Sequence, residues 1–216
     1  MRIAAASLVL VALLASASAL AATAENPQYR PNPADTRAAR ASTLRLGDLG
    51  AGWTGGLKPA GKPQGLSCAS YKAKQSDLVV TGLAEAQFTS SGVNVDSQIQ
   101  VLKTPEMVRL DFQRTVRPEV VRCYGAQFEQ AAGAGTKVVS TKPLPFPRLG
   151  SVSAAYRILA DVTAQGTTVR LLVDVIAVGV RRTEISLVVM APVQAKAPVA
   201  ALEKRLGRVL AGRALP

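Results

Sequence analysis

The chain has 216 residues, and its 26 lysines and arginines exceed its 14 acidic residues, giving a formal net charge of +12 without any histidine. The missing histidine excludes Ser-His-Asp and Cys-His nucleophiles and histidine-based zinc hydrolase sites. No basic block with interleaved aromatics occurs, so we expect no nucleic-acid partner and interpret the charge first as solubilising.

The first 24 residues have the pattern of a secretory signal peptide. Arg2 precedes an uninterrupted run of apolar and small residues, Ile3–Leu20, and two small-x-small sites then end at Ala21 and Ala24. A positively charged N-terminus, a short apolar middle and a cleavage site of small residues are typical of a signal peptide that is removed during export. We therefore expect a secreted or extracytoplasmic protein, cleaved after Ala21 or Ala24, with no cysteine at the cleavage site to carry a lipid.

The next segments are expected to be irregular. Prolines in residues 25–34 indicate a flexible linker, and Asp35 is a candidate N-cap for a short helix that extends to Leu46. We assign residues 25–39 to a linker or short N-terminal helix, and 40–216 to one domain. Glycines and prolines predict a loop over residues 50–67.

Residues 83–102 alternate between apolar and polar side chains around a Ser-Ser-Gly turn, which predicts a half-buried hairpin. Thr104 followed by proline and glutamate predicts a helix start, and Pro118 ends that helix and begins a second one. The proline-rich residues 143–147 predict an extended loop.

Residues 152–190 predict three antiparallel strands, with turns at Gln165-Gly166 and at residues 179–181. A two-residue first turn places Asp161 opposite Arg170 and Arg157 opposite Asp174, and we expect both charged pairs on the solvent side. The core face is then expected to carry alternate residues of the hairpin, joined by three residues of the third strand. These are Tyr156, Ile158, Val162, Val169, Leu171, Val173 and Val175, with Ile185, Leu187 and Val189.

Residues 197–210 predict an amphipathic helix whose apolar stripe leaves Lys204, Arg205 and Arg208 outside it. A basic amphipathic helix lies on an anionic membrane in some proteins. We favour a helix that covers the protein's own sheet, because the sheet needs a cover.

Cys68 and Cys123 are the two cysteines, and an even pair in an exported chain indicates a disulfide. Two reduced thiols or a metal pair are the alternatives. Two sulfurs without histidine make a poor zinc site, so we expect neither a metal nor a cofactor.

Two-carboxylate hydrolysis remains open in principle. However, each acid examined has an ordinary structural role, with an arginine neighbour on a strand or a position at a helix start. The strand acids are Asp161, Asp174 and Glu184, and the helix-start acids are Asp35, Glu106 and Glu119. We therefore expect no enzymatic activity.

The segment Leu44–Thr54 (LRLGDLGAGWT), Cys68, Cys123 and the turn Val178–Arg181 resemble the actinobacterial PknH-like extracellular sensor-domain family. Gly50 departs from that family's usual proline, and one cysteine pair stands where related members often have two. The resemblance implies an α+β fold, with an antiparallel sheet and helices, and a cleft for an unidentified ligand. It brings no catalytic residue with it.

Together these observations predict a single α+β domain, with an antiparallel twisted sheet of about five to six strands packed against helices. The expected function is an exported, non-catalytic ligand-binding or sensor-like domain of the cell envelope, with a small or lipidic ligand. The alternatives are a basic protein that binds anionic wall polymer or lipid headgroups, and a two-carboxylate hydrolase. Candidate ligand contacts are Trp53, Tyr124 and Phe128; candidate surface contacts are Lys204, Arg205, Arg208 and Arg213.

Overall fold

The computed structural model describes residues 25–68 and 71–214, and the expected signal peptide lies outside them. These residues form a single mixed α/β domain whose eight-stranded sheet is not closed into a barrel. The α+β expectation is confirmed, with more strands than expected. The sheet order is β1-β5-β6-β10-β9-β8-β7, with β2 also paired to β5, and all pairs except β1–β5 are antiparallel.

The bounds of the large-sheet strands are as follows: β1 Gln28–Tyr29, β2 Thr54–Lys58, β5 Val79–Ser90, β6 Val93–Leu102, β7 Thr136–Pro143, β8 Val152–Ala164, β9 Thr167–Val180 and β10 Thr183–Pro192. Two short strands, β3 Ser67–Cys68 and β4 Tyr71–Lys72, pair separately. The helices are α2 Pro33–Ser42, α3 Pro105–Thr115, α4 Pro118–Ala132 and α5 Lys196–Arg213.

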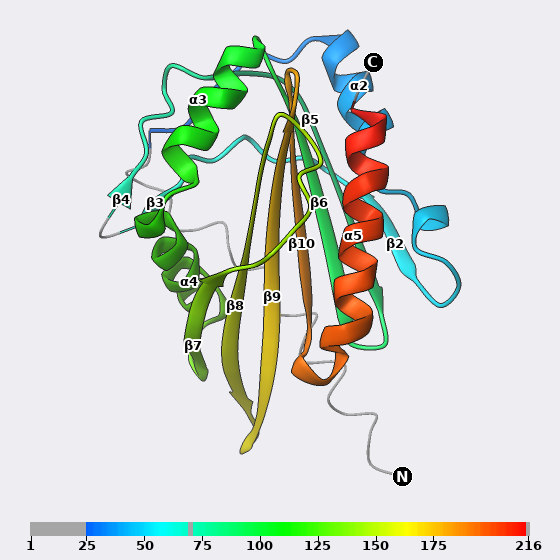
Figure 1. The fold of residues 1–216 in the computed structure, drawn as a ribbon, viewed down its shortest axis with the longest axis vertical. Coiled ribbons are helices and arrows are strands. Elements are labelled where there is room, and N and C mark those ends of the chain that lie inside the picture. The colour runs from blue at the N-terminus through cyan, green and yellow to red at the C-terminus, as the bar shows by residue number, and fades with distance from the viewer. Residues whose placement is uncertain (1–24, 69–70, 215–216) are drawn as a thin grey trace.

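Helices cover both faces of the sheet (Figure 1). On one face, α2 and α5 pack over a large apolar cluster that includes Phe88, Ile176 and Leu206. On the other face, α3 packs over a cluster around Phe112 and α4 over one around Ile158. Strands buried on both faces explain why residues 152–190 are rich in valine, leucine and isoleucine throughout.

The predicted register of the β8–β9 hairpin is confirmed. Asp161 pairs with Arg170, and Arg157 pairs with Asp174. Gln165 and Gly166 form the turn with φ angles of 50° and 75°, the left-handed conformation that a tight hairpin turn requires.

The expected solvent side of this hairpin is wrong for one of its two charged pairs. Arg170 and Asp161 are partly exposed near the turn, but Asp174 is 0% exposed beneath α5, and Arg157 is 13% exposed. On the expected core face, Leu171 is buried, whereas Val169 is 39% exposed at the end of the hairpin. The reason is that α5 covers the middle of the hairpin and leaves its tip open.

The assignment of the third strand to that core face is also wrong. Ile185, Leu187 and Val189 belong to the cluster beneath α2 and α5. The turn consists of residues 181–182, so that Val180 pairs with Thr183. The predicted turn, residues 179–181, has three residues and the observed one has two, and this change of one residue in loop length turns the side chains of the third strand to the opposite face.

Helix boundaries agree well with the sequence-based expectations in the second half of the chain. The Thr104 side chain caps α3 by accepting a hydrogen bond from Met107 N at 3.3 Å, and Pro118 begins α4. The apolar stripe of α5 is buried against the sheet, so the interpretation of this helix as a sheet cover is confirmed. The buried residues of that stripe include Val199, Leu206 and Leu210.

The N-terminal expectations need three corrections. Gln28 and Tyr29 form a strand parallel to β5, so this part of residues 25–39 belongs to the domain instead of a flexible linker. Helix α2 begins at Pro33 with Asn32 as its N-cap, and Asp35 lies in the first turn. Residues 54–58, expected in a loop, form β2, because the edge of β5 offers backbone partners to an extended glycine-containing segment.

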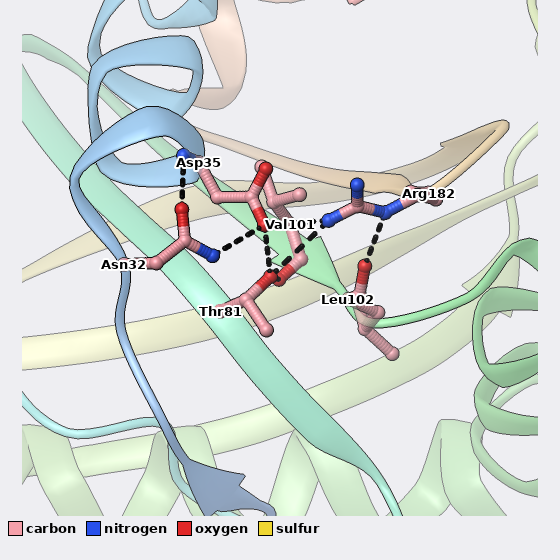
Figure 2. A network of polar contacts seen from close by, with 6 residues as sticks. All are labelled: Asn32, Asp35, Thr81, Val101, Leu102 and Arg182. Carbon is pink, nitrogen blue, oxygen red and sulfur yellow. Dashed lines mark hydrogen bonds and ion pairs between the residues drawn. The ribbon is translucent and has the colours of Figure 1, made fainter.

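A polar network joins this N-terminal region to the sheet (Figure 2). Asp35 Oδ2 accepts hydrogen bonds from Asn32 at 2.9 Å, Thr81 at 2.6 Å and Arg182 at 2.5 Å, and Arg182 Nε donates to Leu102 O at 2.8 Å. Burial opposes the effect, but these hydrogen bonds hold the pKa of Asp35 below its ordinary value. The network therefore links α2, β5, β6 and the β9–β10 turn.

Candidate functional site

A cavity of about 970 Å³ lies between the α3/α4 layer and the sheet, and we call it the α3/α4 cavity. Its floor comes from β5, β6, β9 and β10, its walls come from α3 and α4, and residues 58–66 line it as well. Helix α4 packs mainly over β7, at the far edge of the sheet from β5. The volume is at the upper end of small-ligand pockets, which span roughly 300–1,000 Å³.

The floor of the cavity is polar, although it belongs to a sheet covered on both faces. Gln98 lies opposite Glu85 on β5 and Ser186 on β10, and Gln100 lies opposite Glu184. Gln100 Nε2 donates to Gln98 Oε1 at 2.9 Å, and Gln98 Nε2 donates to Glu85 Oε1 at 3.0 Å. Polar groups that are removed from water without partners destabilise a fold, so this floor suits a cavity that holds water or a polar ligand.

Amides dominate the polar lining. Six of the chain's eleven glutamines line the α3/α4 cavity, contributed by the sheet, by α4 and by the loops that precede β5. They are Gln64, Gln75, Gln98, Gln100, Gln127 and Gln130. An amide offers both donors and an acceptor, so a wall of amides suits ligands rich in hydroxyl or amide groups.

Two carboxyl groups, Asp111 on α3 and Glu184 on β10, also line this cavity, and we call them the acid pair. Burial, the Asp111 charge and a hydrogen bond to Asp111 raise the pKa of Glu184 well above its ordinary value. Burial also raises the pKa of Asp111, although hydrogen bonds from Gln75, at 2.5 Å, and from Glu184 oppose this effect. The two carboxyl groups therefore oppose each other's ionisation, and the pKa of Glu184 is raised well above its ordinary value.

Sequence reasoning missed the acid pair. It gave Glu184 an arginine neighbour, whereas the structure places this side chain against Asp111. Asp111 received no role, although it follows the buried Val108 by three residues and precedes Thr115, a cavity residue, by four. A carboxylate on the inward stripe of an amphipathic helix was the available signal.

The three predicted ligand contacts do not converge. Tyr124 lines the α3/α4 cavity, and burial followed by the Asp111 charge raises its pKa. Phe128 packs in the apolar cluster beneath α4. Trp53 packs against the cluster beneath α2 and α5, on the opposite face of the sheet. A single pocket formed by Trp53 and the residue 104–130 helices is therefore excluded, because the sheet separates them.

The predicted disulfide between Cys68 and Cys123 is present, with Cα atoms 5.6 Å apart. It ties the β3–β4 hairpin to α4, and the Tyr71 hydroxyl adds a hydrogen bond to Arg114 O at the end of α3. Gln75 extends the connection, because its Oε1 accepts from Leu66 N at 2.8 Å while its amide nitrogen donates to Asp111. The covalent link therefore fixes the loop side of the cavity to its helical wall.

The predicted surface contacts on α5 divide into two groups. Arg213 pairs with Asp48 at 2.6 Å and donates to Thr43 O at 3.0 Å, and Arg205 donates to Asp48 O. These two arginines attach α5 to the segment after α2. Lys204 and Arg208 are exposed.

A second acidic cluster lies beneath α5, on the face opposite the cavity. Asp174 pairs with Arg157, and Glu203 is 2% exposed beside it, with Oε1 buried and without a hydrogen-bond partner among the described residues. Burial, followed by the hydrogen bond to Asp174 and its charge, raises the pKa of Glu203 to about 9. This cluster lies in the apolar core, so we interpret it as structural.

The geometry of the acid pair differs from that of a glycosidase. Retaining and inverting enzymes hold their carboxyl groups roughly 5–5.5 Å and 6.5–9.5 Å apart, which leaves room for the sugar or a water. Asp111 and Glu184 instead make a direct hydrogen bond. Within residues 25–68 and 71–214, no group of three or more potential metal ligands is assembled, and no helix is long and apolar enough to span a membrane.

No family model and no curated protein matches this chain. The cavity and the residues that line it are therefore the basis for inferring a function.

Proposed function

We propose that this protein is an exported, non-catalytic ligand-binding or sensor-like domain of the cell envelope, and that the α3/α4 cavity is its binding site. The observation that carries the proposal is the polar floor formed by Gln98, Gln100, Glu184 and Ser186, in the middle of a sheet that is otherwise packed with aliphatic residues. A structural role would be served better by apolar residues at these positions, because they would close the cavity.

The lining favours a polar ligand over a lipid tail. Amides, carboxyls and the Tyr124 hydroxyl are distributed over the floor and the helical wall, among apolar lining residues such as Leu78 and Phe112. A ligand with several hydroxyl or amide groups would satisfy them, whereas an acyl chain would leave them unpaired. The sequence led us to expect a small or lipidic envelope ligand, and this preference restricts the expectation to a polar one. The resemblance to the PknH-like sensor-domain family is consistent with a cleft ligand.

The test begins with the molecule that the protein retains. Mass spectrometry of extracts from the secreted, non-reduced protein should identify a co-purifying polar compound, which should then raise the melting temperature when it is added back. Trp53 is a poor direct reporter because it lies on the other face of the sheet. Incubation with the compound should return it unchanged, and its breakdown would favour a hydrolase instead, since paired carboxyls activate water in some enzymes.

A cavity-filling variant makes the test specific. Ser186→Phe places a large side chain on the floor, and Ala201→Phe places the same side chain on the exposed surface of α5. Thermal stabilisation by the extracted compound should disappear in the first variant and persist in the second. Equal stabilisation of both variants would refute the cavity as the binding site.

The alternative, association with anionic wall polymer or lipid headgroups, is supported by the net charge of +12 and by the exposed Lys204 and Arg208. Such binding should weaken steeply with salt. The double variant Lys204→Ala, Arg208→Ala should reduce retention on anionic vesicles or teichoic acid at low salt. Retention equal to that of the native protein would refute a role for this helix surface.

A further inference from the structure

The acid pair stands out in this basic protein because it has no cationic partner. Three other acids at the helix–sheet junctions are paired with arginines: Asp35 with Arg182, Asp48 with Arg213 and Asp174 with Arg157. Glu203, beneath α5, lies beside the last of these pairs. Among the described residues, no lysine or arginine lies within 4.0 Å of Asp111 or Glu184.

The cations nearest to the acid pair are engaged elsewhere. Arg114, which lowers the pKa of Asp111 slightly through its charge, makes two hydrogen bonds to Asp77 and one to Lys74 O. Lys58, on the cavity wall, lies 4.0 Å from Glu85 and 3.7 Å from Asp96. The negative charge of the acid pair is therefore left to the cavity.

Glu184 also has an unsatisfied oxygen. Its Oε1 is buried and has no hydrogen-bond partner among the described residues. The Gln75 amide nitrogen donates a hydrogen bond to Asp111. The protein therefore supplies a donor to the Asp111 carboxyl group, whereas Glu184 Oε1 has none among the described residues. A ligand with a positive charge and several N–H donors would neutralise the charge of the acid pair and would also donate a hydrogen bond to Glu184 Oε1.

We propose that the acid pair is a cation subsite of the α3/α4 cavity, which binds the ammonium group of a ligand whose hydroxyl or amide groups contact the glutamine-lined wall. This inference rests on the proposed ligand-binding function and names the class of ligand, a polyhydroxylated or amide-bearing amine. An ammonium group has three donors, enough to reach Glu184 Oε1 and Asp111 together.

Binding then changes the protonation of the acid pair. We expect the acid pair to hold one proton before binding, and to release it to solvent when the ammonium binds and both carboxyl groups ionise. Affinity should therefore fall as the pH is lowered through the raised pKa of the pair. The titratable or charged groups that face this site are Lys58, Lys62, Glu85, Tyr124 and, from outside the lining, Arg114.

Two matched polyols test the subsite. Glucamine and sorbitol share the same hydroxylated chain, and glucamine carries a primary ammonium where sorbitol has a terminal hydroxyl. Isothermal titration of the full mature protein should show that glucamine binds roughly tenfold or more tightly than sorbitol at neutral pH. Titrations in two buffers of different ionisation enthalpy should detect proton release with glucamine alone.

Three variants make the result specific. The double variant Asp111→Asn, Glu184→Gln should lose the preference for glucamine, and Glu184→Gln alone should abolish proton release. Glu203→Gln changes a buried protonated acid on the opposite face, so it should keep both properties. Urea unfolding checks that each variant is folded, and removing a buried charge without an ion-pair partner should not destabilise the double variant.

Equal affinity for the two polyols, undetectable binding of glucamine, or a preference that survives in the double variant would each overturn the cation subsite. The proposed ligand-binding function would still hold after any of these outcomes, provided that the extracted compound does not stabilise Ser186→Phe. Stabilisation of Ser186→Phe by that compound would instead refute the cavity itself.

Discussion

Replacing Glu203 with glutamine should stabilise the protein, by an amount that grows with pH. Glu203 is 2% exposed on the inner face of α5, and Asp174 beneath it is 0% exposed. Because its pKa is raised to about 9, Glu203 is protonated at neutral pH and donates a hydrogen bond to Asp174. A glutamine amide donates the same hydrogen bond and does not titrate.

The magnitude follows from the two protonation states. In the unfolded chain, glutamate ionises with an ordinary pKa of 4.5, whereas the folded protein keeps Glu203 protonated up to about pH 9. Between these values unfolding releases a proton, so the free energy of unfolding falls as pH rises, by up to about 1.4 kcal/mol per pH unit. At pH 7 the largest gain that Glu203→Gln can give is therefore about 3 kcal/mol, and near pH 4.5 it vanishes.

Urea unfolding at several pH values between about 5 and 8 measures this difference. Trp53 is the single tryptophan and packs against the apolar cluster beneath α2 and α5, so its fluorescence reports unfolding of this region. Glu106→Gln is the control, because Glu106 is exposed and Arg109 lowers its pKa. A stability difference between Glu203→Gln and the native protein that stays flat across this range, or a less stable Glu203→Gln at the upper end, would refute the reasoning.

Three further predictions concern stability. Arg157→Ala should cost roughly 3–5 kcal/mol because it leaves the buried Asp174 without its counter-ion, whereas Arg170→Ala, near the exposed hairpin tip, should cost far less; similar midpoints in urea would contradict this. Leu171→Ala, at a residue 1% exposed, should cost roughly 2–5 kcal/mol, and an unchanged unfolding midpoint would argue against its burial. Cys123→Ser should cost roughly 4 kcal/mol through loss of the disulfide, and thiols that titrate in the native protein would show that no bond forms.

Local patterns were sufficient to predict most secondary structure and one register. The Gln165-Gly166 turn fixes the β8–β9 pairing because a two-residue loop allows one alignment, and two opposite-charge pairs support it. The cap at Thr104 and the proline at 118 likewise carry their information within a few residues. The disulfide was predicted from the number of cysteines and the expected export signal, neither of which depends on the fold.

Local patterns could not predict which faces of the strands are buried. A polar residue that alternates with apolar ones looks solvent-facing, whether a helix, a cavity or water lies above it. Arg157 and Asp174 lie beneath α5, and Gln98 and Gln100 lie beneath the cavity, yet all four have the same strand pattern. The candidate site draws on segments from residue 58 to residue 186, so only the tertiary structure brings Asp111 to Glu184.

The order of the strands in the sheet has a consequence for how the chain folds. Strands β7 to β10 form a continuous meander of neighbours, and β5 and β6 form a separate hairpin, so each of these two units closes through short loops. They join where β6 pairs with β10, and there residues 94–101 meet residues 183–190. Closing so long a loop has an entropic cost that the contacts offset only after they form, so we expect the pairing of β6 with β10 to be the slow, topology-limited step of folding. The cavity floor lies across the same seam, with Gln98 and Gln100 on one side and Glu184 and Ser186 on the other. The candidate site is thus complete only when β6 and β10 are paired.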